Sequence, residues 1–486
     1  AKPLPSPPVS ELINPVAVQT IRLYPDLFKI VTPINADHLQ ELLQPHPNQP
    51  FVESVCRGLR EGFWPLTIVP IGTPDSFDYS ARPLDEDALT FVQSQRDEEM
   101  AADRFSRPFG PDLLPGMHSG PIGAVPKPHS SDLRLITNQS AGPHTPNSFI
   151  SRDAATVRYD NMQDFGKILR HAHRRFGRPP TYLFKSDCSQ AFRRIPMHFL
   201  WQIRQIITID GARHINRCLV FRNRGAPHIW CAFMSLVVWI AIKIKEIEDL
   251  LHYMDDAFRY EMDPQLEFYG PYNKSYPKKQ VALLRLWDDI SLPHDAKKQE
   301  FGQSLIIIGF HVDPRCMTIS IPQSARQELV DVIAAFIDSS ADCRRPLKKW
   351  QQLLGWANWA LNVFPLLRPA LQSSYDKIAG KHIPDAKIYL NCSVIHDLEW
   401  LAAHVRLNHG LHYFRDVKWD YQDADIIIFC DASGVGLGFL IPKRRLGFAA
   451  NIPVNALVPN IFFYEVMMIA SAVAWAGEPS PPPDAS

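Results

Sequence analysis

The chain has 486 residues, of which 46% are hydrophobic and 21% are charged, a composition that excludes a fibrous or wholly disordered protein. This length leaves room for about two to four domains. The 51 basic and 51 acidic side chains balance, so the total charge does not indicate a nucleic-acid partner and any basic surface must be local.

The first part of the chain alternates between proline-rich and periodic segments. Residues 1–50 hold ten of the 43 prolines, which predicts an extended, partly disordered N-terminal extension with one short helix around 36–43. The charged, proline-free segment 85–104 predicts a solvated helix. Two short apolar runs, 122–127 and 132–137, flank a polar turn and predict a β-hairpin.

Longer periodic elements follow. A long apolar helix is expected at 230–251, and a tight hairpin at 252–260. The apolar stretch 226–242 contains a proline and a histidine and runs into lysines, so it is short and poorly framed for a membrane span. We expect a buried core helix there, and no membrane partner. The remaining expected elements are helices at 161–176, 280–290, 323–339, 346–374 and 461–475, a strand at 181–186, and strand pairs at 203–220, 304–321 and 425–439.

The eight cysteines point to a reducing environment. None of them form a C-x-x-C pair, and their spacing fits neither a disulfide framework nor a zinc site. No charged-then-apolar signal segment follows the first residues. The expected location is therefore intracellular, cytoplasmic or nuclear.

Two adjacent acids, Asp255 and Asp256, stand at the tip of the expected hairpin in the sequence YMDD over 253–256. Such a pair is costly, because the charges repel and partial burial removes water. A divalent cation would offset that cost. Taken alone, the pair is equally compatible with a polar turn, and a second pair at 288–289 is assigned no role.

A third acid, Asp187, follows the expected strand at 181–186, and Phe192 comes five residues later. Beside a hairpin with two further acids, Asp187 would complete a site for two Mg²⁺ ions, with Mn²⁺ as a substitute. Two-metal sites hold their ions ~3.5–4 Å apart, and a few carboxylates with substrate phosphates suit Mg²⁺. A lone strand-end aspartate is more often a helix cap, so the inference depends on the combination.

In this order, the segments resemble the fingers and palm of a reverse transcriptase. The resemblance covers residues 51–380 and depends on five motifs. These are the fingers hairpin (VPK at 125–127 and LRLI at 133–136), the first catalytic motif (187–192), the template-and-nucleotide motif (Phe221, Gly225, Ala226 and Pro227), the YxDD motif (253–256) and the primer grip (305–310).

The subtype resembles the polymerases of fungal retrotransposons of the DIRS and Ngaro groups, on the segments 58–65, 309–314 and 353–362. The resemblance implies an RNA-directed DNA polymerase that extends a primer by in-line phosphoryl transfer. Its partners would be dNTPs and a template–primer duplex of RNA or DNA.

Residue roles follow from the same resemblance. Asp187, Asp255 and Asp256 would hold the metal ions. Lys127 and Arg134 would clamp the triphosphate of the incoming nucleotide, one as a point charge and the other as a bidentate fork.

Two further positions have competing interpretations. Phe192 would lie under the sugar and exclude a 2′-hydroxyl, although core packing also explains a phenylalanine there. Lys297 or Lys298 would lie near the pyrophosphate leaving group, and a solvated lysine is an equal alternative.

A basic helical segment follows the primer-grip motif. Residues 343–381 contain seven Lys and Arg residues against one acid, together with three tryptophans. This location suits a thumb that contacts the phosphates of a nucleic-acid duplex, whereas the tryptophans are expected to be core residues.

The last part of the chain resembles the opening of ribonuclease H. Asp431 ends an apolar strand before a glycine-rich turn, and Glu465 lies on the following helix. That fold needs further carboxylates on a later strand and helix, and the chain ends eleven residues after Trp475. We therefore predict a partial, inactive RNase H-like module.

These observations predict an α+β, right-hand polymerase followed by a partial RNase H-like α/β module. The expected regions are an N-terminal extension (1–50), fingers and palm (51–322), a thumb-like helical region (323–385), a connector (386–424), the RNase H-like part (425–475) and a disordered tail (476–486).

One residue departs from the family pattern. Arg222 follows Phe221 where these polymerases usually have glycine. This departure and the missing acids favour an alternative, a catalytically inactive relic that keeps the fold and nucleic-acid binding. A two-metal nuclease is a third hypothesis, which the fingers hairpin and Phe192 disfavour. The oligomeric state stays open.

Overall fold

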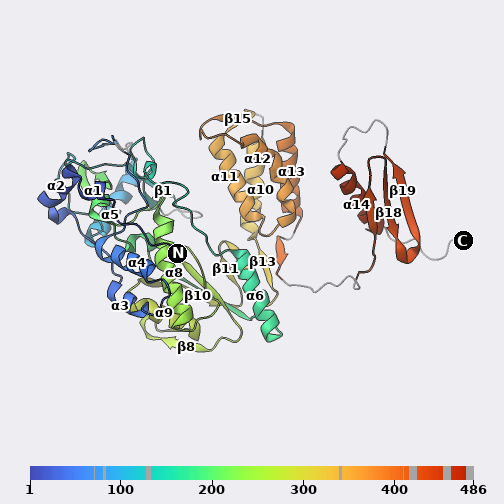
Figure 1. The fold of residues 1–486 in the computed structure, drawn as a ribbon, viewed down its shortest axis with the longest axis horizontal. Coiled ribbons are helices and arrows are strands. Elements are labelled where there is room, and N and C mark those ends of the chain that lie inside the picture. Colours follow the sequence, from blue (N-terminus) through green and yellow to red (C-terminus); the bar gives the residue numbers. More distant parts are fainter. Residues whose placement is uncertain are drawn as a thin grey trace. The chain divides into compact units, whose positions relative to one another are not determined.

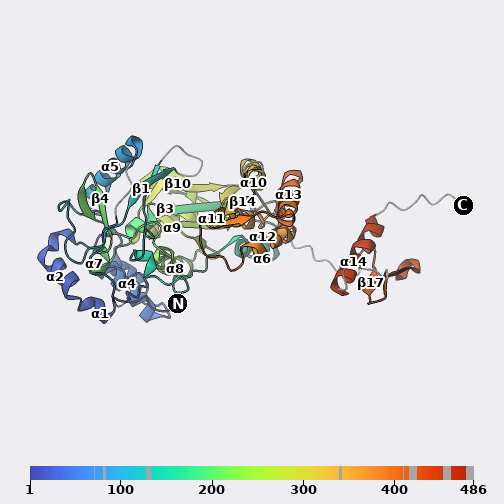
Figure 2. The same ribbon diagram turned by 90° about the horizontal axis from the view of Figure 1, so that it is seen from above.

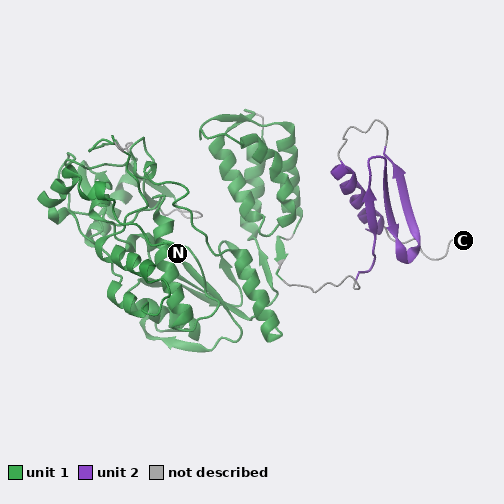
Figure 3. Ribbon diagram, in the orientation of Figure 1, with its two compact units in different colours: residues 1–415 green, residues 416–486 purple. Residues whose placement is uncertain are grey.

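The computed structural model describes residues 1–70, 72–79, 84–126, 133–338, 342–408, 410–414, 424–452 and 461–477. The chain divides into two compact units, unit 1 (residues 1–415) and unit 2 (residues 416–486) (Figure 3). Both units mix helices and strands, as the sequence predicts (Figure 1).

The first fifty residues are folded, which corrects the prediction of an extended lead-in. Pro15 and Pro50 stand in the first turns of helices, where the missing N–H has no intrahelical partner to lose. Asn14 caps its helix by accepting hydrogen bonds from two backbone N–H groups at 3.1 Å. Leu39 and Leu43 are fully buried in the core of unit 1. The helices are α1 (Val9–Leu12), α2 (Pro15–Leu23), α3 (Ala36–Leu42) and α4 (Gln49–Glu61).

Helix α5 (Glu86–Ala101) packs beside two antiparallel hairpins, β1–β2 and β4–β5, as seen from above in Figure 2. Val92 from this helix, Phe105 and Ile207 form a small apolar cluster there. The predicted helix and both predicted hairpins are confirmed. The strands are β1 (Ile122–Pro126), β2 (Leu133–Thr137), β4 (Ile206–Ile209) and β5 (Ala212–Ile215).

An antiparallel sheet of four strands, in the order β10–β3–β7–β6, lies at the centre of unit 1. Residues alternate between its two faces. Phe184 and Ala257 join the core around helices α8 and α9, whereas Leu183 and Phe258 join the core around α6. The bounds are α6 (Met162–Phe176), β3 (Tyr182–Cys188), α7 (Phe199–Gln202), α8 (Ala226–Lys243), β6 (Leu251–Tyr253), β7 (Asp256–Glu261), β8 (Leu266–Tyr269), β9 (Lys274–Pro277), α9 (Lys278–Asp289) and β10 (His294–Gly302).

Helix α8 is the apolar core helix expected from the sequence, with different bounds. Gly225 and Pro227 open it, so it begins at Ala226 and ends at Lys243, whereas 230–251 was predicted. It is the one helix in the described part of the chain that is long and apolar enough to cross a membrane by length and composition. Because 56% of it is buried inside the protein, it serves as a core helix of unit 1.

The helical region after the central sheet is larger than predicted. The helix expected at 346–374 breaks after Ala360, and a 3-10 segment begins at Pro365. Most of the expected connector (386–424) also belongs to unit 1: its described residues up to 414 do, because α13 packs on α10 and β16 pairs with β13. The elements are β11 (Leu305–Ile307), β12 (Phe310–Asp313), β13 (Thr318–Ser320), α10 (Gln323–Ile337), β14 (Arg344–Pro346), α11 (Leu347–Ala360), α12 (Gln372–Ile378), β15 (Lys387–Tyr389), α13 (Cys392–Leu407) and β16 (Leu411–Tyr413).

Unit 2 contains a three-stranded antiparallel sheet and one helix. Strands β17 (Phe429–Ala432), β18 (Gly436–Ile441) and β19 (Leu446–Asn451) pair in sequence order. Helix α14 (Ile461–Gly477) packs through Met468 and Ala472 on the face that carries Phe439. The predicted strand pair and helix are confirmed, and β19 adds a strand that the sequence analysis did not predict.

Candidate active site

The structure brings the three predicted acids to one end of the central sheet. Strands β3 and β7 pair so that Asp187 stands directly opposite Asp256. Because the side chains alternate, both carboxylates belong to the sheet face that packs on α6. Asp255 is in the turn between β6 and β7, and its carbonyl oxygen accepts a hydrogen bond from the Cys188 N–H at 3.4 Å.

The hairpin tip is held by the core helix behind it. Met254, in the turn, has a positive φ of 55°, which is uncommon for a residue other than glycine. The indole N–H of Trp230 in α8 donates a hydrogen bond of 2.9 Å to the Met254 carbonyl oxygen. A fully buried side chain therefore fixes the turn that carries the acids.

Burial raises the pKa of two of these carboxyls. The pKa of Asp256 is raised to about 6, first by burial and also by the negative charges of Asp187 and Asp255, against the cations Lys185 and Lys298. The pKa of Asp187 is also raised, mainly by burial, although its ion pair with Lys298 opposes the shift. Two acids that resist ionisation side by side are typical of a site that receives a cation.

Lys298 distinguishes the two lysines that the sequence left open. Its ammonium donates to the Asp187 carboxylate at 2.8 Å and to the Cys188 carbonyl oxygen at 3.2 Å, whereas Lys297 is exposed. The other carboxylate oxygen of Asp187, Oδ1, is buried and has no hydrogen-bond partner. An oxygen left without a partner fits a metal ligand.

The candidate metal ligands do not form a preassembled cluster in the described residues. The described residues contain no group of three or more His, Cys, Asp or Glu side chains already placed to hold one ion. The unpartnered oxygen of Asp187 and the raised pKa values of two acids fit a cation all the same.

A cavity of about 430 Å³ opens beside Asp255 and Lys298, and aromatic and basic side chains line it. The guanidinium of Arg134 on β2 lies 5.3 Å from the centre of the Phe221 ring. That ring lies 5.1 Å from the ring of Phe192. Residues from three distant segments are thus in successive contact. Phe192 is 7% exposed and is part of the core of unit 1. The other predicted nucleotide-binding residue, Lys127, is outside the described residues.

The segment around Arg222 has an unusual backbone conformation. Arg222 has a φ of 70°, in the left-handed region that favours glycine. The Asn147 side chain stabilises the segment by donating to the Arg222 carbonyl oxygen at 2.8 Å and accepting from the Arg224 N–H at 2.7 Å. Asn223 accepts from the N–H of Gly225, which opens α8 with Ala226 and Pro227.

Sequence reasoning missed the polar residues behind the cavity. Glu99, Gln190 and Arg193 line it, but the acids of 85–104 were interpreted as a solvated face. The pair Arg193-Arg194, directly after Phe192, was the one available signal.

The two acids predicted for the RNase H-like part, Asp431 and Glu465, are more exposed than the acids of the central sheet. Asp431 pairs with Gly438 in the sheet, on the face opposite to the one that packs on α14. Its side chain is exposed and borders an open hollow of about 440 Å³. Glu465, on α14, is exposed as well.

No protein-family model and no curated protein matches this sequence. Three solved structures of the foamy viral protease–reverse transcriptase align with 91% of the chain at 15–16% identity. In complex with RNA/DNA hybrid, that protein gives a TM-score of 0.47 with 56% of its chain covered. In complex with dsDNA it gives 0.48 and 87%, and the dRH form with dsDNA gives 0.48 and 73%.

Proposed function

We propose that this chain is an RNA-directed DNA polymerase of a retrotransposon, a nucleotidyltransferase that extends a primer with dNTPs. The observation that carries the proposal is the pairing of Asp187 with Asp256 beside a cavity that Asp255 and Arg134 line. Motif order alone could not establish that these segments meet. A retrotransposon of the DIRS or Ngaro type remains the proposed source.

Asp187, Asp255 and Asp256 would hold Mg²⁺ or Mn²⁺, which when bound supplies positive charge for phosphoryl transfer. The residues of the chain bind and orient the other groups. Arg134, held against Phe221, would bind phosphate oxygens through its planar fork. Phe192 would limit space at the sugar, and its packing against Phe221 keeps the ring from moving aside.

The helical region after the central sheet would contact the template–primer duplex. Lys348 and Lys349 at the start of α11 and Arg368 are exposed, so they are available to phosphates. The buried Trp350 is a core residue, with an edge-to-face contact to Phe336 at 5.1 Å. Unit 2 would be an RNase H-like module in which Asp431 and Glu465 are the matching acids.

A second candidate is an inactive relic that still binds nucleic acid. Two observations favour it. The Lys298 ammonium occupies one oxygen of Asp187, and Arg222 carries a long side chain at a left-handed position beside Phe221.

Primer extension on an RNA template separates the two candidates. We expect the parent to extend the primer with dNTPs when Mg²⁺ is present, and Asp255→Asn to stop extension while duplex affinity stays within about threefold. Equal extension by parent and variant would refute the polymerase. A parent that binds the duplex without extending it would establish the relic.

Phe192→Val tests the sugar contact in the same assay. A smaller side chain should admit ribonucleotides, so their incorporation relative to deoxynucleotides should rise by at least about tenfold, as for other pockets that lose a steric block. An unchanged ratio would remove Phe192 from the nucleotide site.

A further inference from the structure

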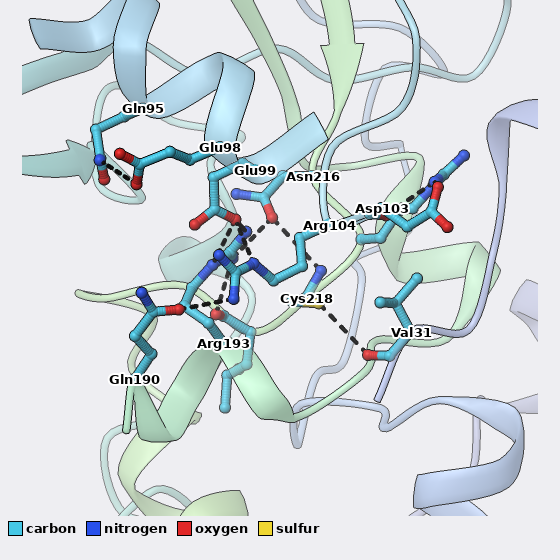
Figure 4. Close-up of polar contacts among 12 residues, drawn as sticks. Val31, Gln95, Glu98, Glu99, Asp103, Arg104, Gln190, Arg193, Asn216 and Cys218 are labelled. Carbon is cyan, nitrogen blue, oxygen red and sulfur yellow. Dashed lines mark hydrogen bonds and ion pairs between the residues drawn. The ribbon is translucent and has the colours of Figure 1, made fainter. Parts of the chain in front are cut away.

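Three charged side chains form a buried cluster behind the turn that follows Asp187 (Figure 4). Glu99, Arg104 and Arg193 are 7%, 6% and 9% exposed. One carboxylate oxygen of Glu99 accepts from the Arg104 Nε at 2.9 Å and from the Arg193 Nε at 3.1 Å. A single acid at the end of α5 therefore binds two guanidiniums from different parts of the chain.

The cluster carries one positive charge in excess, because two guanidiniums share one carboxylate. Burial alone would raise the pKa of Glu99, but the adjacent Arg193 and Arg104 outweigh it and hold the pKa below its ordinary value. Glu99 is therefore charged at neutral pH, and removing its charge would leave two buried cations facing each other.

Both arginines also contact the turn or its surroundings. The Arg104 Nη1 donates to the Gln190 side-chain oxygen at 2.7 Å. The Arg193 Nη1 donates to the Asn216 side chain at 2.9 Å and to the Leu219 carbonyl oxygen at 3.2 Å. In Figure 4 the side chains of Gln190 and Arg193 point toward Arg104 and Glu99. The cluster thus ties α5 to residues 190–193.

This turn has a conformation that needs support. Gln190 has a φ of 54°, in the left-handed region, although it is not glycine. Residues in that region persist when surrounding contacts hold them. The turn connects Asp187 to Phe192, and Gln190 lines the same cavity as Asp255 and Arg134.

Helix α5 has few buried side chains. Among its residues, Val92 and Glu99 alone are buried. Glu99 is therefore the only buried polar attachment of this helix, and its partners are the arginines that hold the turn.

We propose that Glu99 is a positioning residue of the nucleotide cavity, which acts through Arg104 and Arg193 to fix the turn carrying Gln190 and Phe192. The proposal rests on the polymerase function proposed above. As a consequence, α5, a helix with few buried residues, would influence the affinity for the incoming nucleotide.

Hydrogen–deuterium exchange tests the link without requiring activity. Glu99→Gln in the full chain should speed exchange of the backbone amides of residues 189–194 by about tenfold, the effect of losing one charge-assisted hydrogen bond. Glu98→Gln is the matched control, because its carboxylate is exposed and accepts from Gln95 at 2.8 Å. Unchanged exchange in the turn of a folded Glu99→Gln protein would overturn the proposal.

Kinetics tests the consequence for the nucleotide. With the active fraction titrated, Glu99→Gln should raise KM for dNTPs by about tenfold and leave the affinity for the template–primer unchanged. A merely structural role would lower the active fraction without moving KM, and that result would overturn the proposal. If the parent shows no extension at all, the polymerase proposal fails, and the exchange measurement still decides whether Glu99 fixes the turn.

Arg104→Lys covers the case in which Glu99→Gln does not fold. Lysine keeps the positive charge but lacks the planar fork whose Nε and Nη1 bind Glu99 and Gln190. The same acceleration of exchange in residues 189–194 is expected, and its absence in this folded variant would also overturn the proposal.

Discussion

The two units present similar sequence signals in opposite surroundings. In each, an apolar strand leads to an aspartate, Asp187 in β3 and Asp431 in β17. Strand β3 is central in a four-stranded sheet with helices on both faces, whereas the sheet of unit 2 has its single described helix on one face. An aspartate becomes a chemically unusual group when a second layer removes its water.

Neighbouring charges increase the contrast. Asp187 faces Asp256 across paired strands and contacts Lys298, so acids and a cation compete in a partly dry space. Asp431 faces Gly438, which contributes no charge. The candidate site of unit 1 therefore depends on strand register, and three predictions test this conclusion.

The largest expected effect is on catalysis. Asp187→Asn should reduce primer extension by about 10³-fold, because a site that stabilises developing charge loses one of its preorganised groups. Asp431→Asn should change extension by less than about twofold, since it lies in the other unit. Rates are measured with saturating dNTPs and template–primer. A strong loss in Asp431→Asn would show that the comparison between units is wrong.

The second effect is the pH dependence of stability. The pKa of Asp256 is raised to about 6 from the ordinary 3.8, so the folded protein holds this proton more tightly than the unfolded chain. The contribution of this group to stability should therefore be fully present below about pH 4 and should be lost as pH rises to about 6, a change of about 3 kcal/mol. Urea unfolding followed by tryptophan fluorescence measures the slope.

Asp256→Asn should remove that part of the slope and stabilise the protein at pH 7, because the amide carries no charge to bury. Asp431→Asn, at an exposed position, is the matched control. A slope that survives in Asp256→Asn, or a neutral protein less stable than the parent, would contradict the proposed burial of charge in unit 1.

Sequence patterns predicted the parts that depend on short-range order. The hairpin at 252–260 was predictable, because register within a hairpin is local. The pairing of β3 with β7, which brings Asp187 to these acids, joins distant segments and was expected only from the family resemblance. The same patterns could not reveal Glu99, since its role depends on Arg193, 94 residues away. Charged residues on a helix are usually solvated, so nothing in the sequence indicated that Glu99 is buried.

The prolines of residues 1–50 misled the prediction for a different reason. Proline destabilises the interior of a helix but is favourable in its first turn. Amino-acid composition alone does not tell an interior proline from a first-turn proline. The asparagines before α2, α3 and α4 carried the missing signal, because Asn14, Asn35 and Asn48 all cap helices. A search for N-cap residues would have predicted helices in this N-terminal segment.

The smallest expected effect is the one that tests the cation directly. If Asp187, Asp255 and Asp256 bind Mg²⁺, tenfold excess over the dissociation constant should stabilise unit 1 by ~1.4 kcal/mol. For a unit of this size, the melting temperature should rise by about 1–2 °C. Buried tryptophans of unit 1, among them Trp201 and Trp230, report this transition. Asp187→Asn should abolish the shift, and Asp431→Asn should keep it. A shift that persists in Asp187→Asn would place the ion elsewhere, and a parent that does not respond would leave the unpartnered oxygen of Asp187 as a feature of an inactive relic.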